Sequence, residues 1–174
     1  AAAPHACAAL EDYRELEGKA EAAVVAVPTT LHAAVGCALL EAGLDVLVEK
    51  PIAHDLDSAR RLVETAARTG RILQVGHLER FNPAVAALER MKTLPLFFEV
   101  HRLSPFTARS LDVDVVLDLM IHDLDIVLNL VGRMPEEVRA AGISILSPKV
   151  DIANARLAFP GGCVANLTAS RVST

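Results

Sequence analysis

The first part of the chain alternates short apolar runs with segments of helical spacing. Three runs are typical of strands buried on both faces: residues 22–27, 46–49 and 72–75. Two segments of helical spacing separate them, residues 31–42 and 55–70, and a glycine stands at the end of each. This order of strand, helix, strand, helix and strand, with short connections, predicts right-handed βαβ units and a parallel sheet.

After Pro83 the pattern changes. A helix is predicted at about residues 84–92, an alternating strand at residues 97–102 and a strongly apolar helix at about residues 116–131. Three strand-like segments then follow without helices between them: residues 138–146, 152–159 and 163–170. Runs of strands without helices are typical of antiparallel sheet, so we place a domain boundary near residue 94 and expect a mostly antiparallel sheet beyond it.

Composition excludes several classes of protein. Of the 174 residues, 52% are hydrophobic, which excludes disorder, and no apolar run reaches the roughly 18 residues of a membrane span. The net charge of −5 and the lack of a basic block argue against nucleic-acid binding. Cys7, Cys37 and Cys163 are widely spaced, so we expect small buried side chains in a reducing cytoplasm, with neither a disulfide frame nor a zinc site.

Ligands of an open parallel sheet bind beyond the carboxyl ends of its strands, and three such ends can be read from the sequence. They are Pro28-Thr29-Thr30, Glu49-Lys50-Pro51 and Gly76-His77. Lys50 directly follows a buried strand, so its ammonium group is expected at the mouth of a cleft. The alternative is an ordinary loop lysine, and spacing alone does not decide between the two.

Polar residues are few on the helix predicted at residues 116–131. Four of them form one narrow stripe, at positions i, i+4, i+7 and i+11: Asp118, His122, Asp125 and Asn129. Asp118 and His122 can form a hydrogen bond across one turn, and a carboxylate that orients an imidazole is typical of a general base. The stripe either lines a cleft of this kind or is a thin solvated face of the helix.

Four segments together resemble the glucose–fructose oxidoreductase and inositol dehydrogenase family, also called Gfo/Idh/MocA. They are Val-Ala-Val-Pro-Thr-Thr-Leu-His at residues 25–32, Val-Glu-Lys-Pro at residues 48–51, Gly-His-Leu-Glu-Arg-Phe-Asn-Pro at residues 76–83, and Asp118-x-x-x-His122-Asp123. Their order and spacing match over nearly the whole chain. Within the family, the third and fourth segments are most similar to enzymes that oxidise the 3-hydroxyl of UDP-N-acetylglucosamine.

The resemblance implies an α/β fold in two parts. Residues 1–93 would be the C-terminal portion of a dinucleotide-binding Rossmann domain with an incomplete parallel sheet. Residues 94–174 would be the N-terminal portion of an α+β substrate domain with a mostly antiparallel sheet. The resemblance also implies an oxidoreductase that uses NAD or NADP and transfers a hydride between the nicotinamide and a secondary hydroxyl of a sugar, nucleotide-sugar or polyol.

The resemblance also assigns roles to individual residues. His122 would be the acid or base, Asp118 its orienting partner, and Lys50 the contact to the reacting hydroxyl. A tight turn at Pro51 would aim Lys50, and a cis peptide bond is one form of such a turn. The cofactor would be contacted by Pro28, Thr29, His32, Glu49, Lys50 and Arg80. Asp118 would also contact the substrate. Apart from the resemblance, we expect Arg102 or Arg109, before the helix at residues 116–131, to meet a phosphate of a nucleotide-sugar; the alternative is a solvated arginine.

The Gly-x-Gly-x-x-Gly phosphate loop of the family is absent from the sequence, and the chain begins without methionine. We therefore expect the loop upstream, in a longer cytoplasmic protein that forms a homo-oligomer, and we expect the present chain to bind NAD weakly. Two other possibilities stay open. One is a homologue without activity, and the other is a metal-dependent phosphohydrolase with ligands among His77, His101, His122, Asp123 and Asp151.

Overall fold

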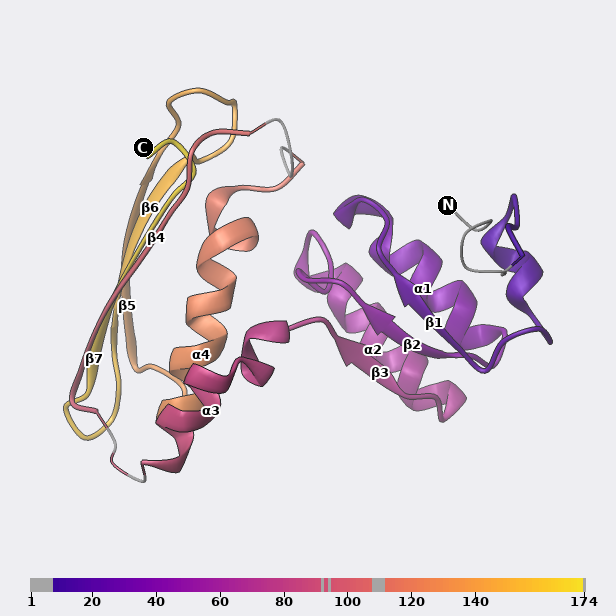
Figure 1. The fold of residues 1–174 in the computed structure, drawn as a ribbon, viewed down its shortest axis with the longest axis horizontal. Helices are drawn as coiled ribbons and strands as arrows, with labels where there is room; N and C mark the ends of the chain where they lie inside the picture. The colour runs from indigo at the N-terminus through magenta and orange to yellow at the C-terminus, as the bar shows by residue number, and fades with distance from the viewer. Residues whose placement is uncertain (1–7, 92, 94, 108–111, 174) are drawn as a thin grey trace. The chain divides into compact units, whose positions relative to one another are not determined.

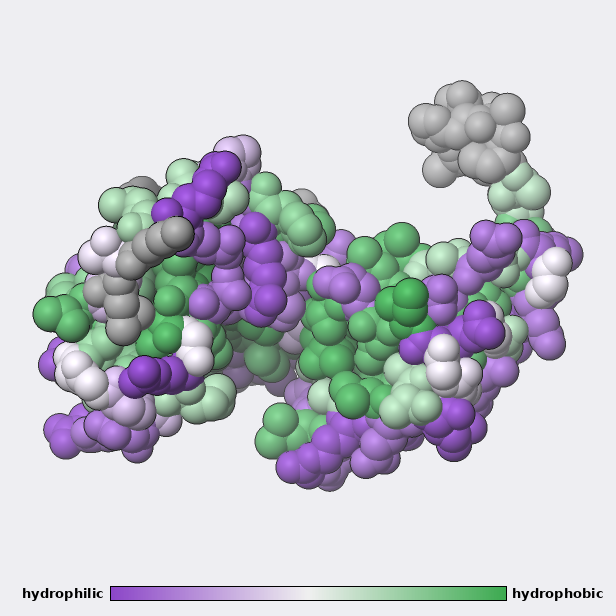
Figure 2. Space-filling view, turned by 90° about the horizontal axis from the view of Figure 1, so that it is seen from below, coloured by the Kyte–Doolittle hydropathy of each residue, from purple (hydrophilic) through white to green (hydrophobic). Residues whose placement is uncertain are grey.

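The structure is a computed structural model that describes residues 8–91, 93, 95–107 and 112–173. It forms two compact units, Ala1–Gly76 and His77–Thr174 (Figure 1). Each unit has its own apolar core, and apolar residues also lie at the surface of both units (Figure 2). Within the described ranges, no helix has the length and apolarity that crossing a membrane requires.

The first unit is built on a three-stranded parallel sheet in the order β1-β2-β3. Its elements in chain order are a 3-10 helix Tyr13–Leu16, β1 Ala22–Val25, a 3-10 helix Thr29–Leu31, α1 His32–Glu41, β2 Asp45–Val48, α2 Leu56–Thr69 and β3 Leu73–Val75. The register pairs Val25 with Val48 and Val48 with Val75, so the three strands end level with one another. The predicted parallel sheet and its βαβ units are confirmed.

Helices α1 and α2 cover one face of this sheet (Figure 1). Alternate strand residues point toward these helices, and Leu40, Val48 and Leu62 are fully buried there. Helix α2 begins after Asp55, whose Oδ1 accepts a hydrogen bond from the Ser58 N–H at 2.7 Å. It ends at a glycine with a φ of 67°. The start and end signals in the sequence therefore act as expected.

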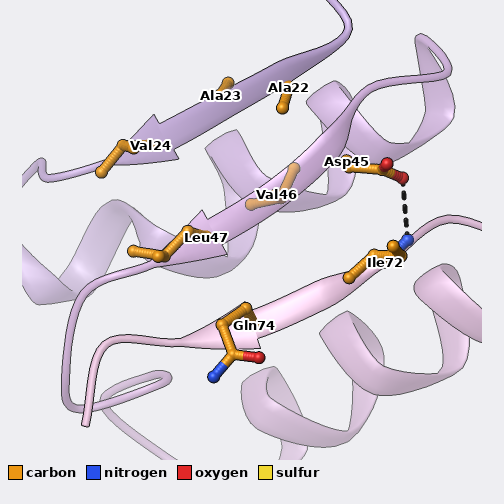
Figure 3. A pocket seen from close by; sticks show the side chains of 8 residues that line it. All are labelled: Ala22, Ala23, Val24, Asp45, Val46, Leu47, Ile72 and Gln74. Atoms are coloured by element: carbon orange, nitrogen blue, oxygen red, sulfur yellow. Dashed lines mark hydrogen bonds between the residues drawn. The ribbon is translucent and has the colours of Figure 1, made fainter. Parts of the chain in front are cut away.

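The opposite face of the sheet carries apolar side chains that are open to solvent. Val24 and Ile72 are 67% and 65% exposed, and they line a shallow hollow of about 260 Å³ together with Leu47 and Gln74 (Figure 3). At the edge of this hollow, the Ile72 N–H donates to Asp45 Oδ1 at 2.9 Å. Parallel sheets normally have both faces covered, so an exposed apolar face is unusual for this type of sheet.

The second unit is built on a four-stranded mixed sheet in the order β4-β7-β6-β5. Its elements in chain order are a 3-10 helix Leu78–Phe81, α3 Pro83–Arg90, β4 Phe97–Leu103, a π-helical turn Val116–Met120, α4 Ile121–Val131, β5 Glu137–Ile143, β6 Ile152–Ala158 and β7 Val164–Ser170. Helix α4 and the π-helical turn pack on one face of the sheet, where Met120, Val127, Leu157 and Leu167 are buried (Figure 1).

The pairing in this sheet is mostly antiparallel, as predicted. Strand β6 is antiparallel to both β5 and β7, whereas β4 and β7 are parallel. The sequence does not reveal the parallel pair, because β4 and β7 are joined through the rest of the unit and not through a short turn.

The division between the two units lies at Gly76 and His77, earlier than the boundary near residue 94 that the sequence pattern suggests. The 3-10 helix Leu78–Phe81 and α3 both contact α4, so they belong to the second unit. The change of pattern marks the start of the strand-rich sequence, and these two short helices precede it within the same unit.

Candidate active site

The carboxyl ends of β1, β2 and β3 lie side by side, as the sequence predicts. Just beyond the strands, the Glu49 N–H donates to Val25 O at 3.0 Å and the Gly76 N–H donates to Val48 O at 2.8 Å. A side-chain carbon at Gly76 would lie 3.0 Å from Glu49 Oε2 and 3.3 Å from its Cα. Glycine therefore allows the end of β3 to approach the end of β2 this closely.

Lys50 and Thr29 follow β2 and β1 at this edge of the sheet. Lys50 is half-buried, and its peptide bond to Pro51 is cis, a form that the resemblance allows. Thr29 is buried in a 3-10 helix, whereas Pro28 before it is exposed. Together with Glu49, the edge offers an ammonium, a hydroxyl and a carboxylate.

His32, at the start of α1, is buried, with 2% of its surface exposed. Its Nδ1 lies 2.8 Å from Pro51 O, and its Nε2 lies 2.9 Å from Val27 O. Carbonyl oxygens accept hydrogen bonds, so the ring links the turn after β1 to the turn that carries Lys50. The resemblance implies a cofactor contact for His32, and the structure shows a side chain that supports the Lys50 turn.

The helix that carries Asp118 and His122 starts with a π-helical turn. The Ile121 N–H donates to Val116 O, five residues back, and Asp114 Oδ1 accepts from the Val116 N–H at 2.9 Å. Such turns are frequent at functional sites, and this one sets where the half-buried side chains of Asp118 and His122 emerge. The sequence pattern predicts a plain α-helix here, because apolar spacing does not distinguish the two hydrogen-bond patterns.

Two aspartates follow His122 on α4, and an arginine binds each of them. Arg102 Nη2 donates to Asp123 Oδ1 at 2.7 Å, and Asp123 is 4% exposed. Arg80 binds Asp125, which is 9% exposed, through Nε at 2.8 Å and Nη2 at 2.6 Å. Hydrogen bonds to these carboxylates raise the pKa of both arginines. The sequence contains a signal for such pairs, since aspartates on a helix that is packed nearly all round need partners.

The roles of Arg80 and Arg102 as ligand contacts stay predictions. Their guanidinium groups contact carboxylates within their own unit, and half of the Arg80 side chain is exposed. A guanidinium has five N–H donors, so an arginine bound to one carboxylate can still donate to a ligand. Arg109 lies outside the described residues.

The polar stripe of the helix changes its surroundings along its length. Asp118 and His122 are half-buried, Asp125 is buried, and Asn129 is exposed and donates to Glu89 of α3. A uniformly solvated stripe is thus excluded, whereas its role as the wall of a cleft stays a prediction.

Asp151, at the start of β6, is fully buried and accepts hydrogen bonds on both oxygens. Oδ2 binds backbone N–H groups at 2.7–2.9 Å, those of Ile145, Leu146 and Ser147. Oδ1 binds the Ser147 hydroxyl at 2.7 Å and Arg171 Nε at 2.9 Å. Burial alone would raise the pKa of Asp151, but these hydrogen bonds hold it well below its ordinary value. The carboxylate therefore fixes the loop between β5 and β6.

The metal site that the sequence leaves open does not form in the part of the chain that the structure describes. Those residues contain no group of three or more His, Cys, Asp or Glu side chains placed to hold a metal ion. Arginines bind the carboxylates of Asp123 and Asp151, and the His101 ring lies 3.0 Å from Glu99 Oε1 on the exposed face of β4.

Both parts of the chain match known protein families. Residues 1–77 match the model of an oxidoreductase family with an NAD-binding Rossmann fold, and residues 86–174 match that of the Gfo/Idh/MocA C-terminal domain. A UDP-N-acetylglucosamine 3-dehydrogenase from Acidithiobacillus ferrooxidans is 40% identical over 167 residues, which are 95% of this chain and 53% of that protein. Myo-inositol dehydrogenase Hyg17 from Streptomyces leeuwenhoekii is 37% identical over 139 residues, covering 75% of this chain and 43% of that protein.

Solved structures show the same similarity. A structure of the Acidithiobacillus ferrooxidans enzyme, at 40% identity, has a TM-score of 0.92 and covers 99% of this chain and 57% of its own. A probable dehydrogenase from Thermotoga maritima, at 25% identity, has a TM-score of 0.84 and covers 94% of this chain and 55% of its own. The chain thus spans about half the length of the relatives that it matches.

Proposed function

Since this chain belongs to the Gfo/Idh/MocA family of oxidoreductases, we propose that the intact protein transfers a hydride between a nicotinamide cofactor and a secondary hydroxyl of a sugar, nucleotide-sugar or polyol. The observation that carries the proposal is the position of Lys50 two residues after β2, at the edge of the parallel sheet where ligands bind. The match of the first unit to an NAD-binding family supports a nicotinamide cofactor, and the choice between NAD and NADP is a matter for experiment.

In the proposed mechanism, a residue of the second unit accepts the proton of the hydroxyl, and a residue of the first unit stabilises the negative charge on its oxygen. Oxidation of an alcohol to a carbonyl removes the O–H proton as well as the hydride. A neutral imidazole can accept that proton, so His122 acts as the base, and Asp118 orients its ring. In the reverse direction the imidazolium returns the proton to the carbonyl oxygen. The Lys50 ammonium stabilises negative charge on the same oxygen, so the proposal requires that both groups act on one hydroxyl.

The side chains at the carboxyl ends of β1 to β3 are chemically suited to contact the nicotinamide end of such a cofactor. Lys50, Thr29 and Glu49 provide charged and polar groups there, and His32 holds the turn beneath Lys50. When bound, the cofactor supplies the hydride acceptor or donor. A pyrophosphate needs a glycine-rich loop before a helix, which this sequence lacks, so the chain supplies only part of the binding site.

We propose a nucleotide-sugar as the substrate, in preference to a free polyol. The support is the 40% identity with a UDP-N-acetylglucosamine 3-dehydrogenase over 95% of the chain, against 37% with a myo-inositol dehydrogenase over 75%. Arg102 on β4 and Arg109 in the segment that follows are the candidates to bind the phosphates, because guanidinium groups match phosphate oxygens in pairs.

The test uses the intact protein with NAD or NADP and with UDP-N-acetylglucosamine or inositol. His122→Ala should lower kcat at least about 100-fold, because a positioned acid or base contributes roughly 10²–10⁴-fold. His54→Ala is the matched control, since His54 is an exposed histidine with no role in the proposed mechanism, and it should keep the parent rate. Parent turnover in His122→Ala would overturn the role of His122, and a preference for inositol would overturn the substrate.

We also propose that the intact protein forms a homo-oligomer. The sheet of the second unit leaves the face opposite α4 exposed, with polar pairs such as Asn154–Thr168 and Arg156–Asn166, each at 2.9 Å. Such a face can meet a second copy of itself about a twofold axis. Sedimentation velocity of the intact protein tests this, and a monomer at micromolar concentration would contradict it.

A further inference from the structure

We propose that the Arg80–Asp125 ion pair sets the proton affinity of His122, which makes Arg80 a positioning residue for the acid–base group. The pair joins the 3-10 helix Leu78–Phe81 to α4 within the second unit. The catalytic meaning of the pair rests on the proposed function, whereas its effect on the imidazole can be measured without any reaction.

His122 lies between two carboxylates along its own helix. Asp118 is four residues before it, in the π-helical turn, and Asp125 is three residues after it on α4, a spacing at which side chains are neighbours on an α-helix. Because Asp125 is buried, water screens its charge less than that of an exposed carboxylate. An unneutralised Asp125 would therefore stabilise the protonated form of His122.

Arg80 removes most of this effect. Its Nε and Nη2 donate to the two oxygens of Asp125 at 2.8 and 2.6 Å, which is the bidentate arrangement of a strong ion pair. The pair has no net charge, so His122 meets the field of a small dipole and not that of a full negative charge.

Other charged groups face the pair from neighbouring elements. His77 precedes the 3-10 helix, and its Nδ1 lies 3.9 Å from Asp125 Oδ2, beyond hydrogen-bond distance. Glu89 of α3 contributes to the raised pKa of Arg80, after the larger contribution of Asp125. On the side of β4, Arg102 is bound to Asp123, and the charge of Glu79 adds a smaller contribution to the raised pKa of Arg102.

The electrostatics of Asp125 agree with this geometry. Burial alone would raise the pKa of Asp125, but the hydrogen bonds from Arg80 and the electrostatic interactions with His77, Arg80 and His122 outweigh burial, and the pKa lies below its ordinary value. His122 and Asp125 therefore interact electrostatically, so a change in the charge of one residue shifts the pKa of the other.

The test is a titration of the histidine signals by NMR in the 174-residue chain, with the His122 signal assigned by its loss in His122→Asn. Arg80→Met leaves Asp125 unneutralised and should raise the pKa of His122 by roughly 0.5–1 unit. Asp125→Asn leaves Arg80 unneutralised and should lower that pKa by a similar amount. The double variant should return to within about 0.3 units of the parent.

Two further variants serve as controls. Arg80→Lys keeps the positive charge and should leave His122 near its parent value, so it carries the test with Asp125→Asn if Arg80→Met does not fold. Arg60→Met breaks an exposed ion pair to Asp57 on α2 of the first unit, where water and salt screen the charge, and should shift the pKa of His122 by less than about 0.2 units. General loosening of the structure would not give opposite shifts from the two members of one pair. Shifts of the same sign, or none, would overturn the proposal.

Kinetics of the intact protein separate this inference from the proposed function. The acid limb of the kcat/KM profile should move to higher pH in Arg80→Met and to lower pH in Asp125→Asn, because the base must be unprotonated. If the NMR shifts occur without these kinetic shifts, the ion pair acts on His122 but His122 is not the catalytic base.

Discussion

Buried polar side chains of this protein hold backbone turns in place. His32 bridges the carbonyls of two turns at the edge of the parallel sheet, and Asp151 gathers three N–H groups of the loop before β6. Arg171 binds Asp151 and also donates to Val113 O at 3.0 Å, shortly before the π-helical turn. His32 thus fixes backbone next to Lys50, and Arg171 fixes backbone five residues before Asp118, so we expect both side chains to act on the proposed site through position.

Asp151→Asn should destabilise the chain at pH 7, and the difference from the parent should shrink in acid. The native pKa of Asp151 is lowered, so its contribution is complete above the ordinary value of about 3.9 and is lost as the pH falls toward the lower native value. Urea unfolding at pH 7 and at pH 3 measures both free energies of unfolding. Asp57→Asn, at an exposed aspartate of α2, should change little at either pH. An equal difference for Asp151→Asn at both pH values would contradict this account.

Secondary structure could be predicted from the sequence where a pattern has one physical meaning. Buried parallel strands give unbroken apolar runs, and the helices between them have clear ends, so β1 to β3, α1 and α2 follow the prediction within a few residues. The π-helical turn Val116–Met120 and the parallel pairing of β4 with β7 could not be predicted in this way, because both depend on hydrogen-bond partners that apolar spacing does not specify.

For the candidate site, the sequence indicates individual residues but not the partners that hold them. Lys50, Asp118 and His122 stand out by position and spacing, although their roles come from the resemblance. The ion pairs of Asp123 and Asp125 were missed, because a sequence shows that a buried aspartate needs a partner but not which arginine supplies it.

The end of α4 offers a test of backbone conformation. Gly132 has a φ of 66°, and a β-carbon there would meet nothing within 4 Å. Gly132→Ala should lower the free energy of unfolding by about 1 kcal/mol, because L-residues are strained in the left-handed region. Gly132→Asn should lose less, since asparagine tolerates that region. Chemical denaturation measures both, and an alanine variant as stable as the parent would show that the helix end relaxes.

Two separate apolar cores lie in one chain, and each unit contributes a different part of the proposed chemistry. The core around Leu40 supports the strand ends with Lys50, and the core around Leu157 supports the helix with His122. Neither unit alone holds both groups, so the proposed activity requires that both cores are folded.

The 174-residue chain should bind NAD weakly, with a dissociation constant of about 1 mM or more, or roughly 4 kcal/mol of binding free energy at most. The reason is that its sequence lacks the glycine-rich loop that binds pyrophosphate at a helix start. Isothermal titration calorimetry tests this, with the intact protein as the control that should bind more tightly. A micromolar constant for the short chain would show that the strand ends alone suffice.

The side chains of Val24 and Ile72 leave a strip of hydrocarbon on the outside of the β1-β2-β3 sheet. Sulfate strengthens the tendency of such a strip to leave water. In a precipitation curve, the chain should therefore salt out at a lower ammonium sulfate concentration than its Val24→Lys form. The same strip should retain the parent chain longer on a phenyl column, which offers a route to purify it.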